Sequence, residues 1–241
     1  MIDTTEIADG VFRVSMWDEK DLIEAGIFWP GVSYNLFVVR DRRPAIVQTM
    51  YRKTFARLRE RVAQVVDPAE LCYIVVPHHE GDSSGAVNEW AAIAPKGTIL
   101  CSGLCAALNL RDFSDRAPRV VSDGEVVDLG ARRLKFFMTP QVNQWDSLMV
   151  YEETTRTLFP NDLFSQPGIE TTTRRDPTQN ALDSARELGY QPNDRANLLR
   201  ALDKIAPLQV EVIANMHDPA VYGHFGALVR AFRENDIATS A

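Results

Sequence analysis

The order of short apolar runs strongly limits what this chain can fold into. Runs rich in β-branched residues alternate with segments of helical periodicity, and no linker rich in Ser, Gly or Pro interrupts them. Three strand-like runs, 11–16, 34–40 and 45–49, follow one another with no helical segment between them. A doubly wound parallel sheet needs a helix between successive strands, so this beginning argues against that fold.

The remaining segments predict a layered α+β fold. Further strands are expected at 71–76, 98–101, 120–122, 125–129, 133–138, 148–151, 157–159 and 210–214. Helices are expected at 53–66, 83–93, from about 105, 178–188 and 194–205, and in a closing segment with an apolar stripe of Val221, Phe225, Leu228, Val229 and Phe232. Strand-rich halves that are each closed by helices predict two mixed sheets packed face to face, with helices outside, in one domain over residues 1–241.

Composition excludes several classes of protein. The 241 residues carry a net charge of −7, and no run of Lys or Arg offsets it, so nucleic acid and anionic membranes are not expected partners. No segment approaches the roughly 20 apolar residues that span a bilayer, and the N-terminus resembles no signal peptide, which predicts a cytoplasmic protein. Three cysteines cannot all pair and lack metal-finger spacing, so reduced thiols are expected.

One loop concentrates side chains that can bind a metal. His78, Glu80 and Asp82 follow the apolar run 71–76 at intervals of two residues, which in an extended stretch places them on one side. Two carboxylates this close favour a bound cation, because otherwise they repel and one takes up a proton. The alternative is that both carboxylates cap the helix that starts near Ser84 and that a backbone group satisfies the imidazole.

Two later residues extend this candidate site. Asp162 and His217 also follow strand ends directly and are expected at the same edge of the sandwich. Imidazole with a majority of carboxylates favours iron or manganese, and zinc is also compatible with these ligand types. His79 should point away from its neighbours, and His224 is expected beside the last helix rather than in the site.

Three segments carry a resemblance to a known family. These are the run Gly-Val-Ser-Tyr-Asn at 31–35, the motif H-x-E-x-D within 73–85, and Leu-Phe-Pro-Asn-Asp-Leu-Phe at 158–164. The chain resembles the metallo-β-lactamase-fold domain of flavodiiron proteins and of their stand-alone oxygen-binding di-iron relatives. The resemblance implies a metallo-β-lactamase-like αββα sandwich. Glu80 is its most specific element, because hydrolases of the superfamily carry a second His there.

The resemblance also implies a ligand set. His78 and Glu80 would bind a first iron, Asp82 and His217 a second, and Asp162 would bridge the two. No flavin-binding or catalytic residue is assigned in this chain.

Three positions depart from the family pattern. Ser83 stands where the family has a His, Asn143 or Gln144 stands where its loop brings another His, and Gln48 replaces a usual Asp. Loss of a ligand should weaken metal binding at least as much as the roughly 10- to 100-fold typical of outer-shell losses. We therefore expect a weakened iron pair, one metal or a vacant site, with Ser83 and Asn143 as weak substitute ligands.

Function follows from the same resemblance. Family enzymes reduce oxygen or nitric oxide with electrons from a flavin in an attached flavodoxin-like domain. No Gly/Ser/Thr-rich phosphate-binding loop follows a predicted strand, so no FMN is expected in this chain and electrons would come from a separate donor. We expect an iron protein that binds or reduces a diatomic gas and forms a homodimer. A metal-dependent hydrolase acting on a small molecule and a non-catalytic descendant are the alternatives.

Overall fold

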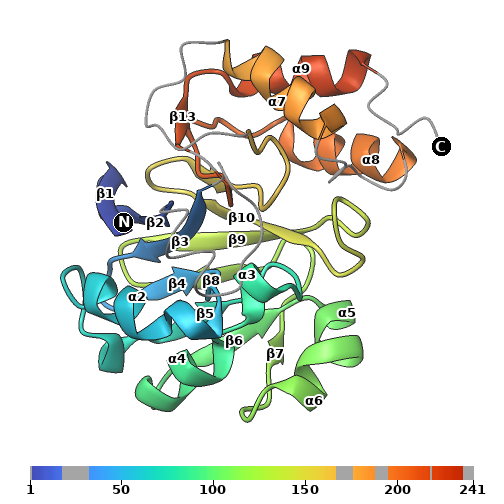
Figure 1. Ribbon diagram of the computed structural model, residues 1–241. Coiled ribbons are helices and arrows are strands. Elements are labelled where there is room, and N and C mark those ends of the chain that lie inside the picture. Colours follow the sequence, from blue (N-terminus) through green and yellow to red (C-terminus); the bar gives the residue numbers. More distant parts are fainter. Residues whose placement is uncertain (1, 18–32, 167–175, 188–194, 218, 236–241) are drawn as a thin grey trace.

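Two sheets lie face to face, with helices on both outer faces, in the computed structural model (Figure 1), which describes residues 2–17, 33–166, 176–187, 195–217 and 219–235. The first sheet contains, in spatial order, β1 (Ile2–Ala8), β2 (Val11–Met16), β3 (Tyr34–Val39), β4 (Ala45–Val47), β5 (Tyr73–Val75), β6 (Thr98–Cys101) and β7 (Arg119–Val120). Strands β1 to β4 pair antiparallel, and β4 to β7 pair parallel. This half of the fold is a mixed sheet, as predicted.

The second sheet is also mixed. Its spatial order is β13 (Val221–Tyr222), β12 (Val212–Ile213), β11 (Thr157–Phe159), β10 (Leu148–Glu152), β9 (Arg133–Met138) and β8 (Val126–Asp128). Only β11 and β12 pair parallel among these strands. The expected sandwich of two mixed sheets is therefore confirmed.

Helices form the two outer layers. The first sheet is accompanied by η1 (Arg52–Thr54), α2 (Phe55–Val62), η2 (Pro68–Glu70), α3 (Gly81–Ser84), α4 (Val87–Ile93), α5 (Gly103–Cys105), η3 (Ala106–Leu110) and α6 (Arg111–Phe113). The second is covered by α7 (Pro177–Glu187), α8 (Arg195–Ile205) and α9 (Phe225–Glu234). Figure 1 shows these two sets, blue to green and orange to red, on opposite sides of the sandwich.

Strand β3 shows how the sequence separates the layers. Its side chains alternate between the two faces of the sheet. Leu36 and Val38 pack in the outer cluster with Trp90 of α4, whereas Phe37 packs between the sheets against Phe159 of β11, with ring centroids 5.2 Å apart. Strand β3 is therefore buried on both faces, because it lies between the apolar cluster under the outer helices and the apolar cluster between the two sheets.

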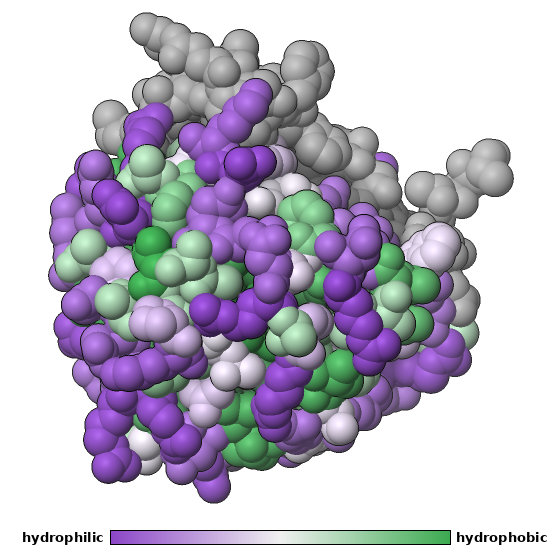
Figure 2. All heavy atoms as spheres, turned by 90° about the horizontal axis from the view of Figure 1, so that it is seen from below, coloured by the Kyte–Doolittle hydropathy of each residue, from purple (hydrophilic) through white to green (hydrophobic). Residues whose placement is uncertain are grey.

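The outer face seen in Figure 2 is mainly hydrophilic, with hydrophobic atoms in scattered small areas. This is the expected surface of amphipathic helices that bury one side. No helix in the described ranges is both long enough and apolar enough to cross a bilayer.

The structure corrects three sequence expectations. The N-terminal segment forms the edge strand β1, which was not predicted because most of its side chains are polar. Val221, expected in the apolar stripe of the last helix, lies in β13 instead. The helix predicted at 83–93 is divided into α3 and α4, because Ala86 between them has a non-helical φ of −105° and its N–H donates to the carbonyl of Met50 at 2.8 Å.

Candidate metal centre

Loops from both sheets meet at one edge of the sandwich. They follow the carboxyl ends of β5, β11 and β12, and backbone hydrogen bonds join them across the sheets. Leu148 N donates to Pro77 O at 2.9 Å, and Asn35 N donates to Met216 O at 3.0 Å. Because the loops are held by backbone contacts next to rigid strands, the side chains that they carry are fixed in position.

The first loop brings together the three residues of the H-x-E-x-D motif. Donor atoms of His78, Glu80 and Asp82 all lie within 4.8 Å of one another, and this is the one such metal-competent group among the described residues. His78 and Asp82 are buried, while half of the Glu80 side chain is exposed. His78 Nε2 lies 3.1 Å from Glu80 Oε2. The predicted convergence of these three side chains is present in the structure.

Asp162 and His217 join this group from the second sheet. His217 Nε2 lies 3.4 Å from Asp162 Oδ1 and 3.6 Å from Asp82 Oδ2. Asp162 Oδ2 lies 3.8 Å from His78 Nδ1, so this carboxylate lies between the two imidazoles. All five side chains named from the sequence therefore meet at one place.

Mutual charge shifts the protonation of this cluster. Burial by itself would lower the pKa of His78, but its contact with Glu80 and the nearby charges of Asp162 and Asp82 raise that pKa to about 9. Burial likewise opposes charge on His217, and Asp162 and Asp82 raise its pKa to about 9. Burial raises the pKa of Asp82 to about 6. Burial also acts to raise the pKa of Asp162, yet the two imidazoles hold it below its usual value.

The positions that depart from the family pattern also lie at this edge or beside it. Asn143 Nδ2 donates to Asp162 Oδ2 at 2.6 Å, and Gln144 Nε2 donates to Glu80 Oε2 at 3.2 Å. Ser83 is fully buried, and neither its Oγ nor Oε1 of buried Gln48 has a hydrogen-bond partner among the described residues. Backbone φ angles of 71° at Gln48 and 70° at Asn143 hold both in the left-handed region.

The sequence analysis did not identify two contacts that orient the imidazoles. The amide of Asn161 lies 2.5 Å from His78 Nδ1, and His217 Nδ1 lies 2.9 Å from the carbonyl oxygen of Ser33. His217 thus donates its Nδ1–H to an oxygen, as metal-binding imidazoles usually do, whereas His78 Nδ1 faces the amide nitrogen of Asn161, which can only donate to it. The Asn that immediately precedes Asp162 was the only sequence signal for the first contact.

Two tyrosines also line the centre without having been predicted to do so. The ring of Tyr34 packs edge-on against His217, at 5.0 Å between centroids, and against Tyr51, at 5.6 Å. Burial, and then the charge of Asp82, raises the pKa of Tyr34 to about 12 and also raises that of Tyr51. Both phenols therefore stay protonated at neutral pH and can donate hydrogen bonds.

His79 and His224 lie apart from this set of side chains, as expected. The ring of His79 contacts Ser84 Oγ at 2.9 Å and packs edge-on against Phe113. His224 is the residue that precedes α9. Phe28 and Trp29, aromatic residues for which a pocket wall, a dimer contact and a core role are all compatible with the sequence, lie outside the described residues.

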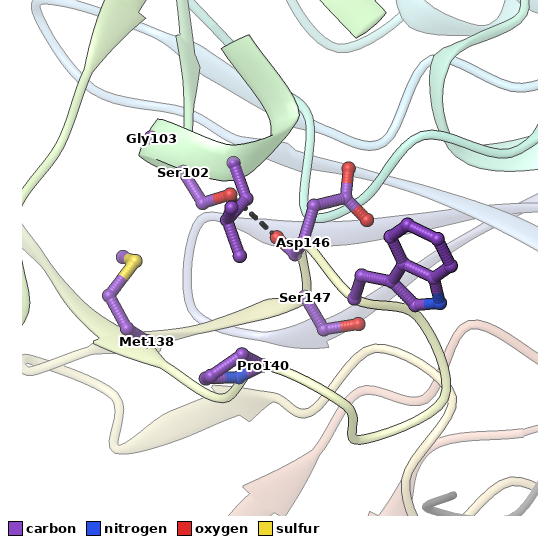
Figure 3. A pocket seen from close by; sticks show the side chains of 8 residues that line it. Ser102, Gly103, Met138, Pro140, Asp146 and Ser147 are labelled. Carbon is purple, nitrogen blue, oxygen red and sulfur yellow. Dashed lines mark hydrogen bonds between the residues drawn. The ribbon is translucent and has the colours of Figure 1, made fainter. Parts of the chain in front are cut away.

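Asp146 anchors the loop that carries Asn143 and Gln144. Its carboxylate accepts a hydrogen bond from His79 N at 2.9 Å, and its carbonyl oxygen accepts one from Ser102 Oγ at 2.7 Å, the dashed line in Figure 3. A mainly apolar hollow of about 230 Å³ lies between this loop and α5 (Figure 3). The hollow contains none of the five clustered side chains, so it is separate from the candidate metal centre.

The donor set fits a hard or borderline divalent cation. Two imidazoles and three carboxylates offer nitrogen and oxygen donors, and no thiol belongs to the group. Asp82 Oδ1 and Ser83 Oγ are buried and have no hydrogen-bond partner among the described residues. Buried polar atoms are rarely left unpaired, so a cation or a water that it holds would satisfy them.

Comparison with known proteins agrees with this geometry. Residues 32–218 match the family model described as ODP family beta lactamase. The chain is 31% identical over 234 residues to putative diflavin flavoprotein A 1 of Nostoc sp. PCC 7120, covering 92% of this chain and 40% of that protein. It is 33% identical over 184 residues to a nitric oxide reductase of Moorella thermoacetica, covering 73% of this chain and 45% of that protein.

Solved structures show the same fold. The rubredoxin oxygen:oxidoreductase of Desulfovibrio gigas superposes with a TM-score of 0.82 at 23% identity, over 96% of this chain and 61% of that one. A fragment, 1–254, of putative diflavin flavoprotein A 5 from Nostoc sp. PCC 7120 superposes with a TM-score of 0.77 at 22% identity, over 97% and 94% of the two chains.

The chain corresponds to only part of its longer relatives. It spans 41%, 34% and 40% of the lengths of three diflavin flavoproteins, and the matched part is their metallo-β-lactamase-like portion. The match to the family model covers well over half of the chain. By its sequence and its fold, this chain belongs to the ODP family of beta-lactamase-like domains, the family that flavodiiron proteins share.

Proposed function

We propose that this chain is a non-haem iron protein that binds or reduces oxygen or another diatomic gas, with electrons from a separate donor. The observation that carries the proposal is the convergence of His78, Glu80, Asp82, Asp162 and His217 at one largely buried edge. Relatives named as a nitric oxide reductase and an oxygen oxidoreductase support the class of substrate. That residues 1–241 form one domain and that the protein forms a homodimer are still predictions.

The chain's own residues would prepare the centre for this chemistry. Bound iron would supply the redox change and an open coordination position for the gas. Ser33 holds the ring of His217 so that Nε2 faces the carboxylates. Tyr34, whose ring packs against His217, and its neighbour Tyr51 keep their protons at neutral pH, so they add no charge near the cluster.

The test compares a histidine inside the cluster with one outside it. Protein from iron-supplemented cells should contain iron, and its ferrous form should change its absorbance on exposure to oxygen or nitric oxide. His217→Ala should lose both properties, because it removes the imidazole that faces Asp162 and Asp82. His79→Ala is the matched control and should keep both, since His79 points toward Phe113. Iron-free protein with no absorbance change would refute the proposal.

Hydrolysis is the second candidate, and the neighbourhood of Asp82 favours it. Ser83 Oγ, next to Asp82, is buried and has no hydrogen-bond partner among the described residues, so it can hold a water beside a bound metal. Zinc-loaded protein that cleaves an ester, thioester or phosphodiester, with activity lost in Asp82→Asn, would support this candidate. No turnover with zinc, iron or manganese would exclude it.

A further inference from the structure

The cluster has two halves, one around His217 and one around His78. They differ in whether N–H donors already occupy their acceptor atoms. In the half around His217, Nδ1 donates its proton to the carbonyl oxygen of Ser33 at 2.9 Å. In the neutral ring, Nε2 is therefore a lone-pair donor, and it faces Asp162 Oδ1 at 3.4 Å and Asp82 Oδ2 at 3.6 Å. Three electron-pair donors thus converge from three separate loops, which is the arrangement that a cation requires.

Unpaired buried oxygens lie in the same half. Asp82 Oδ1 and Ser83 Oγ are inaccessible to solvent and have no hydrogen-bond partner among the residues that the structure describes. Asp82 is 6% exposed, and Ser83 is fully buried. Leaving such atoms unpaired is costly. A cation between Asp82, Asp162 and His217 would satisfy the carboxylate directly and the hydroxyl through a bound water.

In the half around His78, N–H donors already occupy the acceptors. Asn143 Nδ2 donates to Asp162 Oδ2 at 2.6 Å, and Gln144 Nε2 donates to Glu80 Oε2 at 3.2 Å. His78 Nε2 lies 3.1 Å from the same Glu80 oxygen. These amide groups direct partial positive charge at both carboxylates. They therefore occupy carboxylate lone pairs that a first metal would otherwise use.

We propose that this chain holds one divalent cation rather than two, bound by Asp82, Asp162 and His217, and that Asn143 and Gln144 close the half around His78 and Glu80. One imidazole and two carboxylates select iron(II) or manganese(II) over softer ions. The inference rests on the proposed function, because it assigns the metal of the same centre. It changes the expected chemistry, since a single metal cannot share a two-electron reduction with a neighbour.

The experiment titrates metal-free full-length chain with Mn²⁺, whose electron paramagnetic resonance spectrum separates an isolated ion from a coupled pair. One Mn²⁺ per chain with the spectrum of an isolated ion is expected. Two ions per chain, or a coupled spectrum, would overturn the inference and leave the proposed function intact. No binding of Mn²⁺ or of iron(II) would overturn both.

Matched amide variants locate the ion. Asp82→Asn should weaken Mn²⁺ binding by at least about 10-fold, as expected for loss of a metal ligand. Glu80→Gln makes the same chemical change two residues away and should alter the dissociation constant less than threefold. Circular dichroism verifies that both variants are folded. A larger loss in Glu80→Gln than in Asp82→Asn would place the ion in the other half and contradict the assignment.

Discussion

The contact between Asn161 and His78 offers a sharp test of how the centre is organised. Both side chains are buried, the amide lies 2.5 Å from His78 Nδ1, and the backbone of Asn161 is left-handed with φ of 61°. Replacing Asn161 with glycine removes the amide and keeps a residue that adopts this backbone conformation freely. The change therefore isolates the contribution of the side chain.

Two opposing effects determine how far Asn161→Gly changes the free energy of unfolding. A buried imidazole nitrogen left without its partner costs about 1–3 kcal/mol. Relief of left-handed strain returns about 1 kcal/mol. The free energy of unfolding of metal-free Asn161→Gly should therefore fall by about 1 kcal/mol, the difference between these terms. Metal affinity should change little, because the proposed ion is bound by Asp82, Asp162 and His217, and a fall of about 10- to 100-fold, as for other lost contacts to metal-binding residues, would show that the site uses His78.

The assay compares this variant with Arg156→Gly. Arg156 has a φ of 58° and is exposed in the turn between β10 and β11, where its side chain forms an ion pair with exposed Glu211. Urea unfolding gives the stability of each variant, and competition with a chelating dye gives iron affinity. Because the proposed ion is held by Asp82, Asp162 and His217, the iron affinity of Asn161→Gly should stay near that of the parent while its stability falls. Unchanged stability and unchanged affinity together would refute the role of the contact.

Further predictions concern protonation, metal number and backbone packing. Because the pKa values of His78 and His217 rise from 6.5 to about 9, the stability that they give metal-free protein is complete below pH 6.5 and lost as the pH rises through 9. Each can contribute up to about 3 kcal/mol, so urea midpoints that stay constant across this window would contradict the charge pairing. Asn143→His should raise Mn²⁺ stoichiometry from one to two, as counted by plasma mass spectrometry, and a value that stays at one would show that the amide does not close that half. Gly85→Ala should lower the free energy of unfolding measured in urea by at least about 2 kcal/mol, since the added Cβ would lie 2.2 Å from Gly81 O. A free energy of unfolding equal to that of the parent would show that the turn relaxes to accommodate the Cβ.

Much of the fold follows from local pattern. The strand at 133–138 is found with the predicted ends, because alternation and β-branched or aromatic residues define it locally. Edge strand β1 escaped prediction since its outward residues are polar, and the break after Gly85 depends on the hydrogen bond from Ala86 N to the distant carbonyl of Met50. Patterns within one segment cannot reveal such packing.

Some features of the candidate site also follow from the sequence, and others do not. The spacing of His78, Glu80 and Asp82 predicts their convergence, because it depends on a single loop. The contact of Asn161 with His78 spans 83 residues, and that of Gln144 with Glu80 spans 64. Such contacts depend on how loops from different sheets approach each other. The sequence motif alone therefore shows which residues meet and leaves open how their hydrogen bonds divide the site.

The most direct measurement of the central claim is an anomalous difference map from crystals of the iron-loaded chain, recorded at the iron edge. The account predicts one strong peak between Asp82, Asp162 and His217, within coordination distance of all three side chains. Two peaks at this edge of the sandwich, or none there, from protein shown to be iron-loaded before crystallisation, would contradict it.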